Sequence, residues 1–444
     1  MRYALLISAA ILVVVVAIAA WPAPDPPHTP QTQSPSAPSP LPAWAPPDGP
    51  IVAWSADTRA RFEPCGCVAG MYGGLTRRAP LLARVPAGRL LSLELGGWSG
   101  GGLAHERLRT ATYLRGLAAA GIDAVGLGRA EVALGAAVLG QHLREAAAAG
   151  VAMTACNLRA EDGRTLLPDL VEVEAGGRRF AVTSVVPAEA RGPGLAAGDP
   201  ADALAGLLPR LAGRDLVVLA DLDEAGLAQL AGAVPGIALV VGGAVTSPTA
   251  APLAVGQARV VHAANHGKTI GWWPWGSAAC TFELIPDHLP EDPGQRALVR
   301  SYQEALGGAP LAIDRDDAPA GPAFAGSAAC TACHSDVARI HDASRHHRAL
   351  ASVQARGYGH DPECLRCHVT GIDASGGWRR LAGREHLGEV GCEACHGPGA
   401  AHVANPLSAL RPVSQATCLS CHDSENSPRF AYPAYWPLIR HGPP

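Results

Sequence analysis

Eight of the twelve cysteines fall into four Cys-x-x-Cys pairs in roughly the last quarter of the chain, and a histidine directly follows every pair. The four motifs are Cys330-Thr-Ala-Cys333-His334, Cys364-Leu-Arg-Cys367-His368, Cys392-Glu-Ala-Cys395-His396 and Cys418-Leu-Ser-Cys421-His422. With 17 histidines among 444 residues, chance rarely places one after all four pairs. Zinc ribbons and disulfide scaffolds also use paired cysteines, but neither requires a histidine at this position. The spacing therefore indicates a chemistry that needs two thiols and one imidazole together.

Covalent attachment of haem is that chemistry. Two thiols separated by two residues can add to the two vinyl groups of one porphyrin, and the next residue then places its imidazole on the iron. The sequence thus predicts four covalently bound haem c groups whose proximal ligands are His334, His368, His396 and His422. Few large apolar residues accompany the motifs, so the porphyrins must supply much of the buried surface. Attachment of this kind takes place outside the cytoplasm.

The sixth coordination position of each iron decides between electron transfer and binding of a small molecule. Eleven of the seventeen histidines lie in this region, and seven of them are not proximal ligands. These seven are His341, His346, His347, His360, His386, His402 and His441. The number is ample for irons with two histidine ligands each.

The stretch from Ala325 to His441 resembles the tetrahaem cytochrome c-554 and c-prime family, through GSAACTACH, SRHHRAL, HDPECLRCHVTG, VGCEACHGPGAAH, ATCLSCH and YWPLIRH. The resemblance implies that the histidine ending GCEACHGPGxxH is a distal ligand, which is His402 here. By the same matching, His346 of SRHHRAL and His441 of the terminal IRH are distal candidates. Three distal ligands for four irons leave one five-coordinate haem as a hypothesis, with the other histidines in reserve.

The chain before this region divides into segments of different composition. An apolar run from Ala4 to Ala20 follows Arg2, and small residues from Ala17 to Ala19 offer a cleavage site. Residues 1–21 are therefore predicted to be either a signal peptide or an uncleaved membrane anchor, and both place the rest outside the cytoplasm. Residues 22–50 are rich in proline and are expected to form an extended, disordered tether.

Residues 51–286 alternate short β-rich runs with helical stretches rich in alanine and leucine, which predicts a layered α/β domain. The predicted strands are IVAWSA from Ile51, LLSLEL from Leu90, DAVGLG from Asp123, VAMTACN from Val151, DLVVLAD from Asp215, IALVVGG from Ile237 and RVVHAAN from Arg259. Gly176-Gly177 predicts a hairpin turn. Residues 287–324 are expected to be a linker, and residues 325–444 a small, mostly helical or irregular multihaem domain.

The α/β segment resembles the calcineurin-like metallophosphatases of the 5′-nucleotidase type, a layered sandwich that holds two metal ions on Asp and His side chains at strand ends. Asp57 stands where the family's Asp-x-His motif begins, and His266 lies near one ligand region. The other positions depart from the pattern: Arg59, Gly97, Arg129-Ala130-Glu131, Ala220-Asp221-Leu222 and Gly243-Ala244. Too few ligands are left for two metals, so the domain is expected to be catalytically degenerate and to act as a scaffold or docking module.

A Cys65-Gly66-Cys67 sequence follows the first predicted strand. Two thiols at this spacing could hold a soft metal ion near Asp57 or form a redox-active pair. A disulfide to Cys156 and inert, unreacted thiols are the alternatives.

The composition excludes other classes of protein. A hydrophobic fraction of 48%, a formal net charge of −4 and a pI near 6.5 do not fit a disordered tail or a nucleic-acid binder. The expected function is electron transfer by an exported, membrane-tethered tetrahaem cytochrome, whose partners are redox proteins or quinone-linked membrane complexes. Two alternatives stay open, a redox enzyme acting on a small nitrogen or sulfur compound at a five-coordinate haem and a nucleotidase-like or thiosulfohydrolase-like hydrolase coupled to the haems.

Overall fold

The computed structural model describes residues 45–46, 48–64, 71–245, 248–309, 311, 323–380 and 383–441. The chain divides into the units Met1–Pro40 and Leu41–Pro444, and the described residues all belong to the second. The predicted signal or anchor and the Cys65-Gly66-Cys67 sequence lie outside them. Within the described ranges, no helix has both the length and the apolar character needed to cross a bilayer.

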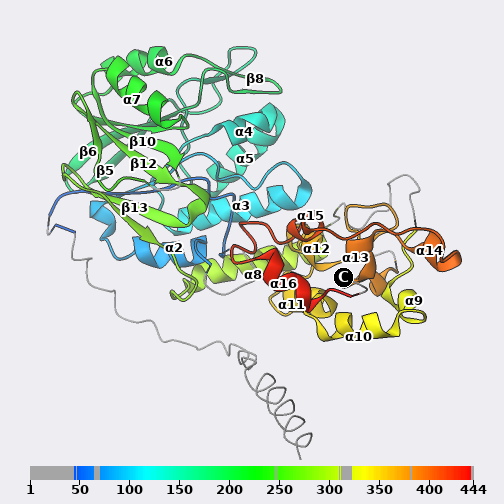
Figure 1. The fold of residues 1–444 in the computed structure, drawn as a ribbon. Helices are drawn as coiled ribbons and strands as arrows, with labels where there is room; N and C mark the ends of the chain where they lie inside the picture. The colour runs from blue at the N-terminus through cyan, green and yellow to red at the C-terminus, as the bar shows by residue number, and fades with distance from the viewer. Residues whose placement is uncertain are drawn as a thin grey trace, which may run out of the picture. The chain divides into compact units, whose positions relative to one another are not determined.

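Two mixed β-sheets form the α/β part (Figure 1). The five-stranded sheet has the order β14-β13-β1-β2-β3, in which β1, β2 and β3 are parallel and β13 runs antiparallel to β1. Its strands are β1 (Ile51–Ser55), β2 (Leu90–Glu94), β3 (Ala124–Val125), β13 (Thr269–Pro274) and β14 (Thr281–Leu284). Every residue of β1 and β2 is buried, as expected for parallel strands covered on both faces.

The six-stranded sheet has the order β11-β12-β10-β9-β6-β5. Its strands are β5 (Val171–Ala175), β6 (Arg178–Val185), β9 (Asp215–Ala220), β10 (Ile237–Val245), β11 (Leu253–Val255) and β12 (Ala258–Ala264). Gly176 and Gly177, with φ of 56° and 74°, form the predicted turn between β5 and β6, because a two-residue hairpin of this type needs positive φ at both positions. A third sheet joins β4 (Leu158–Ala160), β7 (Arg191–Gly192) and β8 (Leu195–Ala197).

Apolar side chains from the two large sheets meet in one core, in which Trp54 and Leu93 of the first sheet pack with Val217 and Val241 of the second. Helices cover the outer faces; α2, α3 and α8 lie together beside the first sheet, and α7 packs on β10 and β12 (Figure 1). The helices are α2 (Leu75–Leu82), α3 (Ala104–Ala119), α4 (Arg129–Ala133), α5 (Gly135–Ala149), α6 (Pro200–Leu207), α7 (Glu224–Ala233) and α8 (Pro293–Gly308). The result is the predicted layered α/β sandwich.

Two elements differ from the predictions. The segment expected to be a linker contains α8, which begins at the N-cap Asp292 and buries Val299, Tyr302 and Leu306. These residues recur at helical spacing, so they form an apolar face that overrides the linker-like composition. The run from Val151, predicted as a strand, forms only an isolated bridge between Met153 and Val125.

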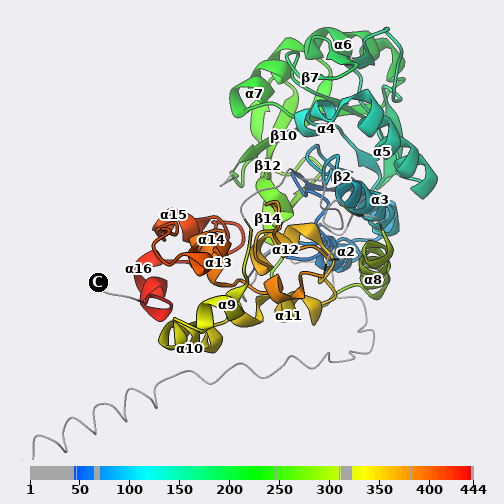
Figure 2. The ribbon, with the colours of Figure 1, turned by 90° about the vertical axis from the view of Figure 1, so that its right-hand side faces the viewer.

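The region from residue 323 onward consists of short helices and irregular segments, and its described residues contain no strand (Figure 2). The helices are α9 (Ser327–Thr331), α10 (Ser335–Ala343), α11 (Ala349–Gln354), α12 (Pro362–His368), α13 (Cys392–His396), α14 (Ala400–Ala404), α15 (Gln415–Leu419) and α16 (Tyr432–Tyr435). Single 3₁₀ turns are η1 (Ala87–Arg89), η2 (Leu208–Arg210), η3 (Asn265–Gly267), η5 (His346–Arg348), η6 (Glu385–Leu387) and η7 (Trp436–Leu438). The apolar core here is small, and Leu407 is 93% exposed.

Candidate functional site

Each Cys-x-x-Cys-His motif lies on or at the end of a short helix, namely α9, α12, α13 or α15. Backbone bonds from His334 N to Cys330 O (3.0 Å) and from His422 N to Cys418 O (2.9 Å) close one helical turn in two of the motifs. Residues three and four apart share one face of such a turn. The two cysteines and the histidine of a motif therefore lie on the same face of the helix.

Three proximal histidines lie opposite the three histidines that the sequence suggests as distal ligands. The ring centres of His334 and His402 are 6.3 Å apart, those of His422 and His346 are 6.1 Å apart, and those of His396 and His441 are 5.7 Å apart. With metal–nitrogen bonds of about 2 Å on each side, two imidazoles on one iron have their ring centres about 6 Å apart. These pairs fit a haem with two histidine ligands.

Hydrogen bonds fix which ring nitrogen faces the partner ring. Nδ1 lies 2.8 Å from Ser408 O in His402, 3.3 Å from Arg411 O in His396 and 3.1 Å from Ile439 O in His441. A carbonyl oxygen only accepts hydrogen bonds, so Nδ1 carries the proton and Nε2 keeps a lone pair for a metal. Burial lowers the pKa of His346, His396 and His422, which favours the neutral ring that an iron needs.

The fourth proximal candidate, His368, has the same arrangement, with Nδ1 2.7 Å from Ala349 O. The three predicted distal histidines all stand opposite other motifs. Among the reserve histidines, His341 and His347 face each other with ring centres 5.6 Å apart, and no Cys-x-x-Cys-His motif contributes to that pair.

The four motifs lie next to one another. Within the described residues, their cysteines form no disulfide. The thiol of Cys330 in the first motif is hydrogen-bonded to Cys392 of the third, and that of Cys421 in the fourth is hydrogen-bonded to Cys367 of the second. Cys395 of the third motif also interacts with Cys418 of the fourth. Every motif therefore has at least one neighbour whose attachment cysteine is in direct contact with its own.

The strand-end site beside β1 has a different character. Asp57 follows β1 directly, and Arg59 binds both of its carboxylate oxygens, with Nε–Oδ1 at 2.9 Å and Nη2–Oδ2 at 3.2 Å. His266, which lies in η3 between β12 and β13, places Nδ1 3.2 Å from Asp57 Oδ2. Arg59, which stands where the family motif has a histidine, thus binds the Asp57 carboxylate that would otherwise be free to bind a metal ion.

The neighbouring strand ends come together as the resemblance implies, but with other partners. Arg129 N and Nε bind Asp221 Oδ2 at 2.5 and 3.3 Å, and the fully buried Glu131 accepts bonds from the amides of Gly97, Ser99 and Gly128. A Cβ atom on Gly97 would lie 2.9 Å from Asp57 Cα, so an aspartate has no space there. Two metal ions do not fit this set of donors.

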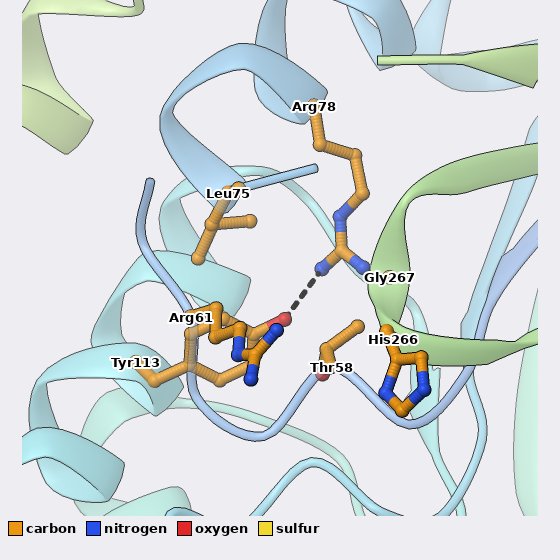
Figure 3. A pocket seen from close by; sticks show the side chains of 8 residues that line it. Thr58, Arg61, Leu75, Arg78, Tyr113, His266 and Gly267 are labelled. Carbon is orange, nitrogen blue, oxygen red and sulfur yellow. Dashed lines mark hydrogen bonds between the residues drawn. The ribbon is translucent and has the colours of Figure 1, made fainter. Parts of the chain in front are cut away.

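A small cavity adjoins the site, lined by Thr58, Arg61, Arg78, Tyr113 and His266 among others (Figure 3). Arg78 reaches into it from α2 and bonds with Tyr113 Oη at 3.2 Å and with Glu94 Oε2 at 2.7 Å. Arg78 is 2% exposed and Glu94 is fully buried. Although burial alone would lower it, the pKa of Arg78 is raised by Glu94, and the two side chains form a buried ion pair beside the cavity.

Comparison with known proteins separates the two parts of the chain. Residues 329–397 match the family model of cytochrome c554 and c-prime. The cytochrome c-554 of Nitrosomonas europaea is 33% identical over 98 residues, which take in 19% of this chain and 40% of that protein. We refer to residues 323–441, which contain the matched stretch, as the cytochrome c554-type domain.

Solved structures match the α/β part. The NAD nucleotidase of Haemophilus influenzae is similar with a TM-score of 0.51 and 12% identity, covering 63% of this chain and 64% of the other. A 5′-nucleotidase precursor (21% identity, 58% and 59% covered) and a sulfate thiohydrolase (17% identity, 60% and 62% covered), both from Thermus thermophilus, have TM-scores of 0.49. The chain spans less than two thirds of the length of each of these proteins. The metallophosphatase-like fold is confirmed, and the likeness extends to the fold alone.

The cysteines outside the cytochrome c554-type domain are only partly within the described residues. Cys156 and Cys280 are buried and free, so the disulfide considered for Cys156 is not formed. Burial raises the pKa of Cys156 to about 11, which makes this thiol a poor nucleophile or metal ligand at neutral pH. Cys65 and Cys67 lie outside the described residues.

Contacts between the cytochrome c554-type domain and the α/β part involve residues that the sequence did not single out. Tyr358 bonds with Glu63, and Glu363, which precedes the second motif, pairs with Arg109 of α3. Glu425, three residues after His422, reaches Arg59 and Arg61. No local pattern distinguishes these acidic residues from solvated ones, because their partners lie hundreds of residues away in sequence.

Proposed function

We propose that this protein is an exported tetrahaem c-type cytochrome that transfers electrons between redox partner proteins or quinone-linked membrane complexes. The observation that carries the proposal is the set of three histidine pairs, each with one Cys-x-x-Cys-His member and ring centres 5.7 to 6.3 Å apart. When bound, haem iron supplies one-electron chemistry. The thiols of the eight motif cysteines would hold the groups covalently, and the three histidine pairs would each offer two imidazoles to one iron.

The residues around the imidazoles determine how the rings are oriented and which ring nitrogen carries the proton. The carbonyl groups of Ser408, Arg411 and Ile439 hold Nδ1–H of three rings, which increases the basicity of the ligating nitrogen. Contacts between motif cysteines favour short distances between neighbouring groups. Electrons would then cross the domain without a large movement of the chain.

Iron and haem content test the number of groups. We expect four irons per chain by elemental analysis and four haems by the pyridine haemochrome assay, with no manganese or zinc. Replacing Cys392 and Cys395 together by alanine should lower both numbers to three, since two thioether bonds attach each group. Replacing Cys156 and Cys280 together should leave four. A ratio of three in the unaltered protein would disprove the tetrahaem assignment.

The α/β part is proposed to be catalytically degenerate and to serve as a docking module. Its support is the bidentate Arg59–Asp57 pair and the lack of space for a side chain at Gly97. A guanidinium repels a divalent cation at the one carboxylate that the family pattern retains. Metal-dependent hydrolysis therefore has no support in the side chains present.

Export and tethering by residues 1–21 are part of the proposal, because covalent haem attachment takes place outside the cytoplasm. In cells, the full chain should be found with the membrane fraction and carry covalent haem. Deleting residues 2–21 should leave the chain in the cytoplasm with less than about a tenth of its haem. N-terminal sequencing then separates an uncleaved anchor from a cleaved signal. Full haem content in the deletion variant would contradict the role in export.

A further inference from the structure

The loop after the fourth motif inserts a carboxylate between two arginines and a histidine of the strand-end site. Glu425 Oε2 lies 2.6 Å from Arg61 Nη2, and Oε1 lies 3.2 Å from Arg59 Nη1 and 3.6 Å from His266 Nε2. Glu425 belongs to the cytochrome c554-type domain, whereas the other three residues belong to the α/β part. One side chain thus occupies a receptor built by two separate loops of the other part.

The receptor has a charge that suits a carboxylate. Arg59 is shared between Asp57 and Glu425, and Arg61 forms its ion pair with Glu425. Without Glu425, the guanidinium of Arg61, whose side chain is only 22% exposed, would lose this partner while it is largely withdrawn from water. A group in that position requires an anion.

The backbone of the receptor is held in an unusual conformation. Asp57, Arg59, Ala60 and His266 have φ of 51°, 50°, 51° and 59°, a left-handed region that residues other than glycine seldom adopt. Backbone bonds from Asp57 N to Gly96 O and from Arg59 N to Gly97 O enforce it. Such conformations persist only where the surroundings over-determine them, and they concentrate at binding sites.

The same loop contacts the proximal histidine of the fourth motif. Asp423 Oδ1 accepts bonds from Glu425 N (2.9 Å) and Asn426 N (2.6 Å), which makes a tight turn. Ser427 Oγ lies 3.0 Å from His422 Nδ1, and the ring of Phe430 stacks on that of His422 at 4.6 Å and 11°. Glu425 and the group that orients His422 are therefore two residues apart in one turn.

We propose that Glu425 is a positioning residue, which docks the loop of residues 423–427 into the receptor of Arg59, Arg61 and His266 and thereby fixes the orientation of His422. The proposal rests on the ligand role of His422 in the proposed function. Through this contact the α/β part then contributes to the properties of the haem attached at Cys418 and Cys421, and loss of Glu425 leaves the other three haems unaffected. The strand-end site thus binds a carboxylate of the same chain, that of Glu425.

The test uses the full haem-loaded protein and three single variants: Glu425→Gln, Arg61→Gln and, as a matched control, Glu385→Gln. Glu385 is an exposed glutamate of the same domain, so its variant changes the net charge equally. Two readouts are compared, a spectroelectrochemical titration of the haems and the hydrogen exchange of amides 423–427. Neither readout requires a known electron donor.

We expect Glu425→Gln and Arg61→Gln to shift the same single reduction wave and to speed exchange in residues 423–427 on the order of tenfold. The effects of the double variant Glu425→Gln/Arg61→Gln on potential and exchange should equal those of each single variant, because both substitutions remove the same interaction. The Glu385→Gln protein should have the same hydrogen exchange in residues 423–427 as the unaltered protein, and no single reduction wave should shift in it. Unchanged exchange and potentials in Glu425→Gln, or an equal shift of all waves, would overturn the proposal.

The haemochrome assay on every variant separates this proposal from the proposed function. If Glu425→Gln retains four haems and none of its reduction waves shifts, the positioning role alone is refuted. A haem number other than four in the unaltered protein would refute the tetrahaem function first. Near-ultraviolet circular dichroism verifies that each variant retains its packed core, so a folding defect is recognised as such.

Discussion

Replacing His402 by alanine is expected to convert one low-spin haem into a high-spin haem. The ring of His402 lies opposite that of His334, with ring centres 6.3 Å apart and ring planes 22° from parallel. Loss of this ring removes one strong axial ligand, and an iron left with one histidine becomes high spin. Electron paramagnetic resonance of the oxidised protein should show one additional high-spin signal and one low-spin signal fewer.

The pairing makes a sharper test available. His441 stands opposite His396, a different motif, so the double variant His402→Ala/His441→Ala should produce two new high-spin haems. Replacing the exposed His288 of the α/β part by alanine is the control and should leave all signals unchanged. Spectra of the His402 variant that are identical to those of the unaltered protein would eliminate this ligand assignment.

Replacing Glu94 by glutamine is expected to lower the free energy of unfolding by about 3–5 kcal/mol, the range for a buried ion pair that loses one partner. Glu94 is fully buried at the end of β2 and accepts bonds from Arg78 (2.7 Å) and Thr58 (2.5 Å). The variant leaves the guanidinium of Arg78, 2% exposed, without its counter-charge. Urea denaturation followed by far-ultraviolet circular dichroism measures the effect.

An exposed ion pair supplies the comparison. Asp215 and Arg178 are 28% and 46% exposed, so Asp215→Asn should cost no more than about 1 kcal/mol. The double variant Glu94→Gln/Arg78→Met should be more stable than Glu94→Gln alone, because it removes the stranded charge. A loss below about 1 kcal/mol in Glu94→Gln would show that water or another group compensates the charge.

The sequence predicted well what depends on neighbouring residues. A Cys-x-x-Cys-His motif contains its whole geometry within five residues, and all but the last residue of the β-rich run IVAWSA from Ile51 become β1. The run VAMTACN from Val151 is also largely apolar, yet it forms one bridge only, because strand formation requires a partner edge that the sequence does not reveal. The helix α8 was hidden by the proline and glycine residues around it, although Val299, Tyr302 and Leu306 repeat at helical spacing.

Contacts between residues far apart in the sequence could be predicted only from a family resemblance, and some could not be predicted at all. His402 was suggested by a family motif, but its position opposite His334 depends on the fold of the 67 residues between them. Glu425 had no such motif, and its carboxylate differs from solvated ones only in three partners that lie more than 150 residues away. Long-range complementarity of charge has no signature in a single sequence.

The unequal distribution of apolar core implies an order of maturation. The α/β part has two packed sheets with helices on both outer faces, and its own apolar side chains form the cores between the sheets and beneath the helices of the second sheet. The cytochrome c554-type domain has few buried apolar side chains, so a chain that has not yet received its haems lacks the material to fold there. We therefore expect the C-terminal thiols to stay accessible to the attachment machinery until the haems are bound. Chains that miss this step are expected to keep an open, protease-sensitive end, which would couple cofactor loading to survival of the protein.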